Sequence, residues 1–496
     1  MNKNILTYIP TGLNSPETEI LLSITQKQIN KKKNVTVLLC RGGQNYHCSK
    51  NIYSIKTICI ACRNKTNNAL AKIKGQYLKL YTPKINKSNL LEKINFTFKK
   101  TINYNYKNCD NGLAAYSSYV DITRDKDMNG FFAQKIIKKL INTSNSLTDF
   151  YYEILKNNDY NEIYMFNGRM NTYRPLLRVS DFFKKKIHNL EFNGSKNQIF
   201  DFENSLPIDQ NYIANKINKF WRSNKKKKIY LIDAHIKKII KYQSLIHKSL
   251  FRVKQTFKKL PIKWDVGKRN IVYFASSGDE SLTGGKTYFF NVFKDQVESI
   301  EYIYKKIKKI DNFRKINFWV RMHPRMTGFK WPFLNNLYKL KEKYPDLNLI
   351  YPESDCSSYE MLKKSSLIIS PVSSLSIEAL HFKKPSINFQ KQPFVILKGS
   401  YFPINKKELM NLIFNIKLKP RSILAQKKFH LFYLDGGFKS SDIKGDFNKN
   451  GYFYKNEKIR FGYGYKTIYD YGKIIEKYIY NFSNFIFYFL IKINKQ

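Results

Sequence analysis

The chain has 496 residues, which is enough for two or three domains. Hydrophobic residues make up 43% and aromatic residues 16%, which excludes a disordered chain, a collagen-like repeat and a small disulfide scaffold. The formal net charge is +51, yet only 14 of the 88 basic residues are arginine. This excess of lysine fits a codon-biased surface that also suits an anionic membrane. It argues against a dedicated nucleic-acid site.

The first two hundred residues predict a parallel α/β sheet. Residues 5–9 and 35–39 are apolar strand candidates, and a helix is expected between them. Ser15 and Pro16 suit its start, and Glu17 and Glu19 suit the positive end of its dipole. A second strand–helix unit spans residues 159–191, where the strand 162–166 runs into Asn167-Gly168-Arg169. Such compact units are typical of doubly wound sheets.

A second α/β pattern begins after a lysine-rich helical connector. Its strands are expected at 270–275, 318–320, 347–350, 367–369 and 386–389, and its first helix carries an apolar stripe over Phe293, Val297, Ile300, Tyr304 and Ile307. We therefore expect two Rossmann-like domains with a cleft between them. The expected parts are an N-terminal acceptor domain over 1–225, a connector over 226–265, a C-terminal nucleotide-donor domain over 266–445 and a helical, aromatic and basic tail over 446–496.

The sequence predicts a cytoplasmic protein. The apolar run at its start is too short for a signal peptide, and no stretch reaches ~18 apolar residues. The run 485–491 in the tail, flanked by Lys492 and Lys495, is too short to cross a bilayer. Two interpretations of the tail stay open: an interfacial anchor at the inner face of the cell membrane, or a helix packed back on the domains.

Six cysteines raise the question of a metal site. Cys40, Cys48, Cys59 and Cys62 lie within 23 residues and end in a C-x-x-C pair, which is a usual half-site for structural zinc. The wider spacing of the first pair equally fits free thiols in a packed loop, and a disulfide or redox role is a third interpretation. The remaining cysteines, Cys109 and Cys356, look like isolated buried residues.

Three loops of the second domain each follow a strand and therefore meet at one rim of the sheet. They are Ser276–Glu280, Arg321–Arg325 and Ser370–Ser374, and a helix carrying Glu378 follows the last of them. Hydroxyls, an imidazole, guanidiniums and a helix N-terminus suit a phosphate-containing ligand. Taken singly, Ser373 and Ser374 equally fit helix caps, His323 a buried histidine and Glu378 a surface residue.

These motifs resemble the bacterial capsule polysaccharide biosynthesis proteins, which are glycosyltransferases of the two-domain GT-B fold. The resemblance covers about 1–65, 160–195 and 266–395. It rests on motifs in both domains, namely Tyr8-x-Pro10-Thr11-Gly12, Phe166-Asn167-Gly168-Arg169, the Ser276 loop with Gln296, Arg321-x-His323-Pro324, Ser373-Ser374-x-Ser376-x-Glu378 and Lys384-Pro385. The pattern is also similar to bacterial sialyltransferases and CDP-glycerol glycerophosphotransferases, so the sugar stays open.

The resemblance implies roles in the donor site. His323 would contact the donor phosphate or ribose and steady the departing phosphate, and Arg321 would neutralise its charge. The hydroxyls of Ser276, Ser277, Ser373 and Ser374 would complete the donor site, with Glu378 at the ribose. No Asp-x-Asp motif follows a strand, so catalysis is expected to need no metal or other cofactor.

An acceptor site is expected in the first domain. Asn167 and Arg169 would hold the acceptor, a growing surface polysaccharide or its lipid-linked form. The candidate bases for its hydroxyl are Glu191 in the first domain and Asp279 or Glu280 in the second. A solvated acid among lysines and a simple Asn-Gly turn are the plain alternatives for Glu191 and Asn167.

Three functions remain in competition. The favoured hypothesis is a transferase that moves a sugar from a nucleotide-sugar donor. The second is a polyol-phosphate transferase that uses a CDP-polyol, and the third is a non-enzymatic basic protein that binds nucleic acid or membrane. The ordered His-Pro and Ser-Ser loops favour the two enzymes, whereas only the net charge favours the third.

Overall fold

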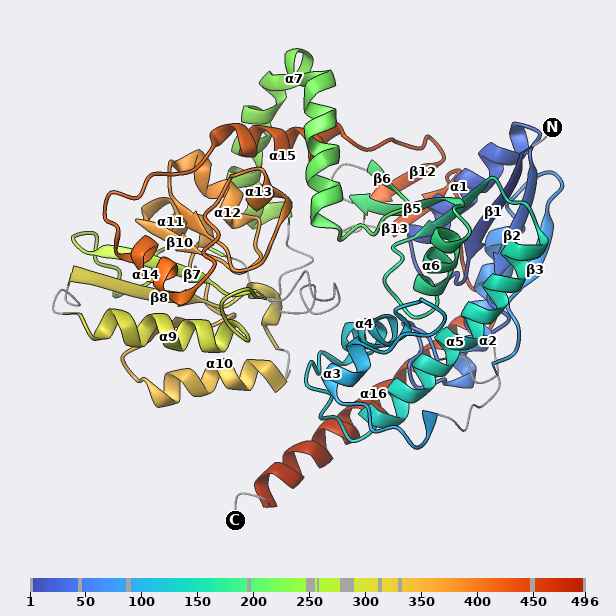
Figure 1. Ribbon diagram of the computed structural model, residues 1–496, viewed down its shortest axis with the longest axis horizontal. Coiled ribbons are helices and arrows are strands. Elements are labelled where there is room, and N and C mark those ends of the chain that lie inside the picture. The colour runs from blue at the N-terminus through green and yellow to red at the C-terminus, as the bar shows by residue number, and fades with distance from the viewer. Residues whose placement is uncertain are drawn as a thin grey trace. The chain divides into compact units, whose positions relative to one another are not determined.

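The computed structural model describes residues 3–42, 47–85, 91–193, 198–246, 255–256, 258–276, 290–310, 315–328, 332–446 and 451–493. The chain divides into two compact units (Figure 1). Unit 1 combines residues 1–207 with residues 437–496, and unit 2 comprises residues 208–436. The boundaries therefore fall at 207 and 436, where the sequence suggested 225 and 445.

The sheet of unit 1 has the strand order β3-β2-β1-β4-β5-β6. All neighbours are parallel except β5 and β6. The strands are β1 (Asn4–Ile9), β2 (Asn34–Leu39), β3 (Leu78–Tyr81), β4 (Glu162–Phe166), β5 (Lys186–Asn193) and β6 (Gln198–Glu203). The expected strand over 162–166 is confirmed to the residue, because a short buried apolar run between polar residues leaves little choice of boundary.

Helices cover both faces of this sheet, and others pack on those helices. The helices of unit 1 are α1 (Glu17–Asn30), α2 (Lys56–Leu70), α3 (Phe98–Ile102), α4 (Asn111–Thr123), α5 (Ala133–Asn157), α6 (Arg174–Phe182) and α16 (Tyr465–Ile493). Residues of β1 alternate between the two cores. Ile5 and Ile9 pack in the core that contains α1, whereas Leu6 and Tyr8 pack in the core that contains α5 and α6. This alternation is the period-two pattern of a strand covered on both sides.

The end of the chain completes unit 1. The hairpin β12 (Ile443–Asp446) and β13 (Gly451–Tyr454) places Tyr452 in the same core as Ile5. The helix α16 then runs along α2, where a Cβ on Gly472 would lie 2.6 Å from Ile58. The expectation of a helix from about Lys466 is confirmed, and the structure adds that the residues before it form a hairpin.

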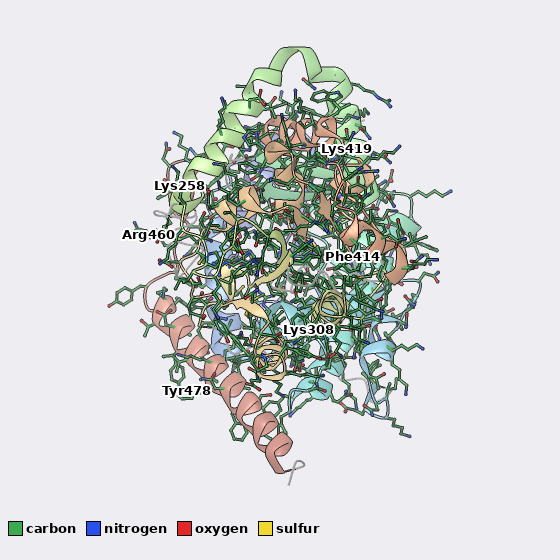
Figure 2. All side chains as sticks on the ribbon, turned by 90° about the vertical axis from the view of Figure 1, so that its left-hand side faces the viewer. Lys258, Lys308, Phe414, Lys419, Arg460 and Tyr478 are labelled. Carbon is green, nitrogen blue, oxygen red and sulfur yellow. The ribbon has the colours of Figure 1, made fainter. Side chains whose placement is uncertain are left out.

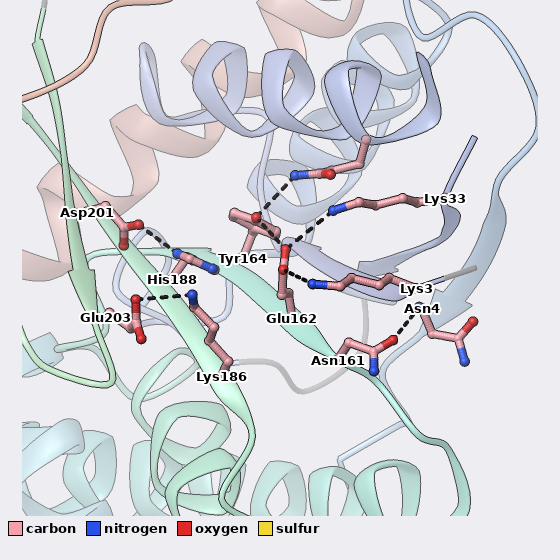
Figure 3. Close-up of polar contacts among 11 residues, drawn as sticks. Lys3, Asn4, Lys33, Asn161, Glu162, Tyr164, Lys186, His188, Asp201 and Glu203 are labelled. Atoms are coloured by element: carbon pink, nitrogen blue, oxygen red, sulfur yellow. Dashed lines mark hydrogen bonds and ion pairs between the residues drawn. The ribbon is translucent and has the colours of Figure 1, made fainter. Parts of the chain in front are cut away.

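A polar network ties the neighbouring strands of unit 1 together (Figure 3). Glu162 accepts a hydrogen bond from the Tyr164 hydroxyl at 2.9 Å and pairs with Lys3 at 3.3 Å. His188 stacks on Tyr164 with ring centroids 4.5 Å apart, and its Nδ1 lies 2.6 Å from the carboxylate of Asp201 on β6. These contacts link β4, β5 and β6, so we assign the network to the stability of the sheet.

Unit 2 holds a second, fully parallel sheet with the order β11-β10-β7-β8-β9. Its strands are β7 (Arg269–Phe274), β8 (Ile316–Arg321), β9 (Asn348–Ile350), β10 (Leu367–Ile369) and β11 (Ser386–Ile387). Its helices are α7 (Gln210–Ile246), α9 (Gln296–Lys308), η4 (Pro324–Met326), α10 (Pro332–Lys343), α11 (Ser358–Lys364), α12 (Leu375–Glu378), η5 (Ala379–Phe382), α13 (Pro393–Ile396), α14 (Lys406–Phe414) and α15 (Ile423–Asp435). The expected fold class of two doubly wound, Rossmann-like α/β units is confirmed.

The segment expected to connect the domains belongs to unit 2. The helix α7 packs on α15, where Ile232 and Ile236 form a small core with Leu431. The ring of Phe220 meets that of Phe432 at 5.9 Å. The expected helix is present, and apolar residues at helical spacing give it a face that packs within unit 2.

Candidate functional site

The first group of candidate residues lies at the carboxyl ends of β1, β4 and β5 in unit 1. The strand order reverses between β1 and β4, which is where ligands of doubly wound sheets bind. Directly after β4, Asn167 and Gly168 adopt left-handed backbone angles with φ of 64° and 72°. A Cβ on Gly168 would lie 2.4 Å from Asn189, so this tight turn requires glycine.

The side chain of Asn167 bridges a carboxylate and a guanidinium. Its Nδ2 donates to Oε2 of Glu191 at 2.8 Å, and its Oδ1 accepts from Nε of Arg169 at 2.9 Å. The structure therefore brings together the three residues that the sequence proposed for the acceptor and its base. Asn167 and Gly168 also form the turn that the plain interpretation predicted. The catalytic roles stay predictions.

Glu17 is a fourth member of this group, and the sequence pattern did not mark it as a site residue. Its Oε2 accepts a hydrogen bond from Nδ2 of Asn14 at 2.8 Å. The pKa of Glu17 is raised to about 7, mainly by burial and also by Glu191, whereas Lys50, the hydrogen bond from Asn14 and Arg169 act in the opposite direction. An acid in the first turn of a helix is ordinarily a dipole partner, so its sequence position alone carried no functional signal.

The loop that presents Glu17 is fixed by close packing. A Cβ on Gly12 would lie 2.6 Å from the backbone nitrogen of Thr66 on α2. The hydroxyl of Thr18 donates to the carbonyls of Thr11 and Asn14 at 2.9 and 2.7 Å. The Tyr8-x-Pro10-Thr11-Gly12 motif therefore builds a rigid turn after β1 that carries Asn14 beside Glu17.

The four clustered cysteines line one small cavity of about 40 Å³ beside this group. Cys59 accepts from Asn51 and Cys62 lies 3.1 Å from the Thr11 hydroxyl. Burial raises the pKa of Cys48 to about 12 and raises that of Cys62. Within the described ranges, no three His, Cys, Asp or Glu side chains form a group that fits one metal ion. The arrangement fits free thiols better than a zinc site. Cys109 and Cys356 are buried free thiols, as expected.

The second group of candidates lies on unit 2, where β10, β7 and β8 are neighbours and end at one rim. After β7, the backbone N–H of Ser276 donates to Oε1 of Gln296, and Nε2 of Gln296 donates back to the Ser276 carbonyl, both at 3.1 Å. The paired bonds fix where this loop leaves the sheet. Ser277, Asp279 and Glu280 lie outside the described residues.

His323 follows β8 and caps the short helix η4. Its Nδ1 accepts the backbone N–H of Arg325 at 3.1 Å. In the neutral ring the proton is therefore on Nε2, which makes that nitrogen a donor. The side chain is partly exposed at the rim, so the alternative of a fully buried histidine is wrong.

The Ser-Ser loop after β10 is largely paired within itself. The Ser373 hydroxyl accepts the N–H of Leu375 at 3.2 Å, and the Ser374 hydroxyl donates to Oε1 of Glu378 at 2.9 Å. Tyr359 donates to the other oxygen of Glu378. Glu378 is buried, which raises its pKa, so the surface interpretation of this residue is wrong. Its two oxygens hold the loop, which favours a positioning role over direct ribose binding.

Arg321 differs most from expectation. Its side chain is 1% exposed, and its guanidinium donates to the carbonyls of Tyr351 and Ser354. Burial lowers its pKa to about 10. The guanidinium of Arg321 is bound to the loop after β9 and holds that loop in place. Its position therefore does not support the expected role in neutralising a departing nucleotide.

No protein-family model and no curated protein matches this sequence. Among solved structures, the β-Kdo 2,4 transferase of KpsC from Thermosulfurimonas dismutans is 11% identical, covers 54% of this chain and 78% of the transferase, and has a TM-score of 0.34. UDP-GlcNAc 2-epimerase from Neisseria meningitidis is 14% identical, covers 87% of this chain and 99% of the epimerase, and has a TM-score of 0.29. The chain is thus distantly similar in fold to these transferase and epimerase structures, and its fold class rests on the two sheets themselves.

Proposed function

We propose that the protein is a metal-independent glycosyltransferase that moves a sugar from a nucleotide-sugar donor to a hydroxyl of a surface polysaccharide or its lipid-linked precursor. The observation that carries this proposal is the rim of unit 2, where adjacent strands present Ser276, His323 and Ser373 at their carboxyl ends. Phosphate-containing ligands bind at such strand ends, where backbone N–H groups and neutral donors converge.

The division of labour follows from the chemistry of each group of residues. The rim of unit 2 offers neutral donors, such as Nε2 of His323, that stabilise charge on a departing phosphate. The group in unit 1 offers carboxylates and cations, which suit a polar acceptor and its proton. We therefore assign the donor to unit 2 and the acceptor to unit 1.

A thermal-shift panel of CMP, CDP, UDP and GDP tests the proposal. A nucleotide at 100 times its dissociation constant stabilises the native state by ~2.7 kcal/mol, which corresponds to about 5–10 °C for units of this size. His323→Ala is expected to abolish the shift. The control is His381→Ala, which changes a histidine in η5, after the Ser-Ser loop and α12. This variant should keep the thermal shift. Absence of a shift with all four nucleotides would refute the transferase, and a response to CDP-glycerol alone would favour the polyol-phosphate alternative.

We further propose that unit 1 docks on anionic membrane through α16. Tyr471, Ile474, Tyr478 and Phe482 recur at helical spacing and are 60%, 52%, 70% and 53% exposed. Figure 2 labels Tyr478 on this helix. Exposed lysines flank this stripe, and aromatic rings beside lysines suit a lipid headgroup layer. Phe485, Phe487 and Phe489 extend the pattern in sequence, but their side chains lie outside those described. Among the described residues, no helix has the length and apolar character to span a bilayer.

A further inference from the structure

Glu17 and Glu191 are two carboxylates in one group, and their hydrogen bonding differs. Both oxygens of Glu191 are engaged, since Oε2 accepts from Asn167 at 2.8 Å and Oε1 accepts the N–H of Phe192 at 3.3 Å. In Glu17, Asn14 holds only Oε2. Within the described ranges Oε1 of Glu17 has no hydrogen-bond partner, and it keeps contact with solvent. One carboxylate is thus tied into the framework, and the other presents an open, oriented oxygen.

Charged and titratable groups face Glu17 from every element around it. Lys50 comes from the segment after β2, Arg169 from the turn after β4, Glu191 from β5 and Tyr173 from the start of α6. Burial and Glu191 disfavour the charged form of Glu17, whereas the two cations favour it. The balance places its pKa at about 7, which is the range in which a carboxylate both ionises and accepts a proton effectively near neutral pH.

We propose that Oε1 of Glu17 is the proton acceptor for the acceptor hydroxyl, and that Glu191 is a positioning residue that acts through Asn167 and Arg169. This inference rests on the proposed glycosyltransferase function and names its base. It replaces Glu191 as the candidate base. The sequence singled out Glu191 as the carboxylate of the first domain, whereas in the structure Glu17 is the carboxylate with an open oxygen and a raised pKa.

The chemical step conserves atoms and charge. The O–H bond of the acceptor breaks and its proton moves to Oε1 of Glu17. The acceptor oxygen forms a bond to the anomeric carbon of the sugar, while the bond from that carbon to the phosphate oxygen of the nucleotide breaks. The electron pair of that bond leaves with the nucleotide. Glu17 later releases the proton to water, which restores the carboxylate.

Titration of the glutamate side chains tests the inference without turnover. In full-length protein with ¹³C-labelled glutamate, the carboxyl resonance of Glu17 should titrate near pH 7, and comparison with Glu17→Gln distinguishes it from buried Glu19 and Glu378, whose pKa values are also raised. It should be absent in Glu17→Gln and should move to lower pH in Glu191→Gln, because removing that negative charge lowers the pKa of Glu17. Persistence of the resonance in Glu17→Gln, or no glutamate titrating above pH 6, would overturn the inference.

Turnover provides the second test. Release of CMP, UDP or GDP from CMP-N-acetylneuraminate, UDP-N-acetylglucosamine or GDP-mannose is measured with octyl galactoside as the hydroxyl acceptor. Glu17→Gln should lower kcat at least 100-fold and remove the loss of activity below pH 7. The control, Glu19→Gln, makes the same change on a buried glutamate held by Ser15 and should keep kcat within threefold.

Three outcomes separate the possible failures. If Glu17→Gln keeps its turnover and Glu191→Gln loses it, Glu17 is not the base while the transferase stands. If the wild-type protein neither releases nucleotide nor shows a thermal shift with any nucleotide, the transferase function fails and the role of Glu17 fails with it. If Glu17→Gln loses its native circular dichroism, Glu17→Ala replaces it, and a normal pH profile in that variant with unchanged kcat would also count against the inference.

Discussion

Replacing Glu17 by glutamine should stabilise unit 1 in a strictly pH-dependent way. The pKa of Glu17 is raised from about 4.5 to about 7 in the folded chain, mainly by burial. The folded state therefore binds more protons than the unfolded state between these values, and stability falls as the pH rises through that window. Glutamine keeps an oxygen that accepts from Asn14 but carries no charge.

The size of the effect follows from the shift. A tenfold change in proton affinity corresponds to about 1.36 kcal/mol, so raising the pKa from 4.5 to about 7 costs up to ~3.4 kcal/mol above pH 7. Glu17 is partly exposed, and solvent screening reduces the expected gain to ~2 kcal/mol. At pH 4.5 the wild-type side chain is protonated in the folded state, so the variant and the wild type should differ by less than ~0.5 kcal/mol.

Urea denaturation at pH 4.5 and pH 8 measures this difference, and the chain supplies its own control. All four tryptophans, Trp221, Trp264, Trp319 and Trp331, belong to unit 2, so tryptophan fluorescence follows that unit alone. Far-UV circular dichroism follows both units. The substitution should raise the dichroism midpoint at pH 8 and leave the fluorescence midpoint unchanged. A loss of stability at pH 8, or an equal gain at both pH values, would refute the reasoning.

Four further predictions concern other parts of the molecule. Arg321→Ala should lower the stability of unit 2 by ~3 kcal/mol in urea, because it removes a buried side chain and its two hydrogen bonds to the carbonyls of Tyr351 and Ser354, whereas the rim variant His323→Ala should not. Gly168→Ala should destabilise unit 1 by ~2 kcal/mol or more, since the turn is left-handed and a Cβ would overlap Asn189. Nucleotide release should continue in excess EDTA, and a chelator-sensitive rate restored by Mg²⁺ would contradict the metal-independent mechanism. Tyr478→Ser with Phe482→Ser should reduce sedimentation with phosphatidylserine vesicles at least tenfold at low salt, whereas Ile416→Ser, an equally exposed residue of unit 2, should not.

Local patterns predicted β1, β2, β4 and the strands of the second sheet, because each is a short apolar run with clear ends, whereas β3, β5 and β6 were not predicted. The strands over 162–166 and 367–369 begin and end where expected. The hairpin β12–β13 escaped prediction because its partner is the N-terminal core, more than 400 residues away, and four-residue strands carry little periodicity.

The site was predictable in part for the same reason. Residues that follow a strand lie at its rim by topology, which explains Asn167 and Arg169, whereas Glu191 lies within β5 and was proposed from the family resemblance. The direction in which a side chain points is not a property of the strand pattern. Arg321 ends a strand like any rim residue, yet it turns inward to backbone carbonyls, and Glu17 resembles any helix-capping acid until its neighbours are known.

The insertion of unit 2 between the two parts of unit 1 sets the order of events during synthesis. Every residue of unit 2 has been made once the ribosome passes residue 436, whereas the core of unit 1 still lacks Tyr452 and Tyr454 at that point. Apolar residues of the β1 core therefore stay uncovered during synthesis until residues 437–496 have been made. A truncated chain that ends at residue 207 would lack this cover, so unit 1 is best produced as a single polypeptide in which residues 437–496 are joined to residues 1–207 by a short linker.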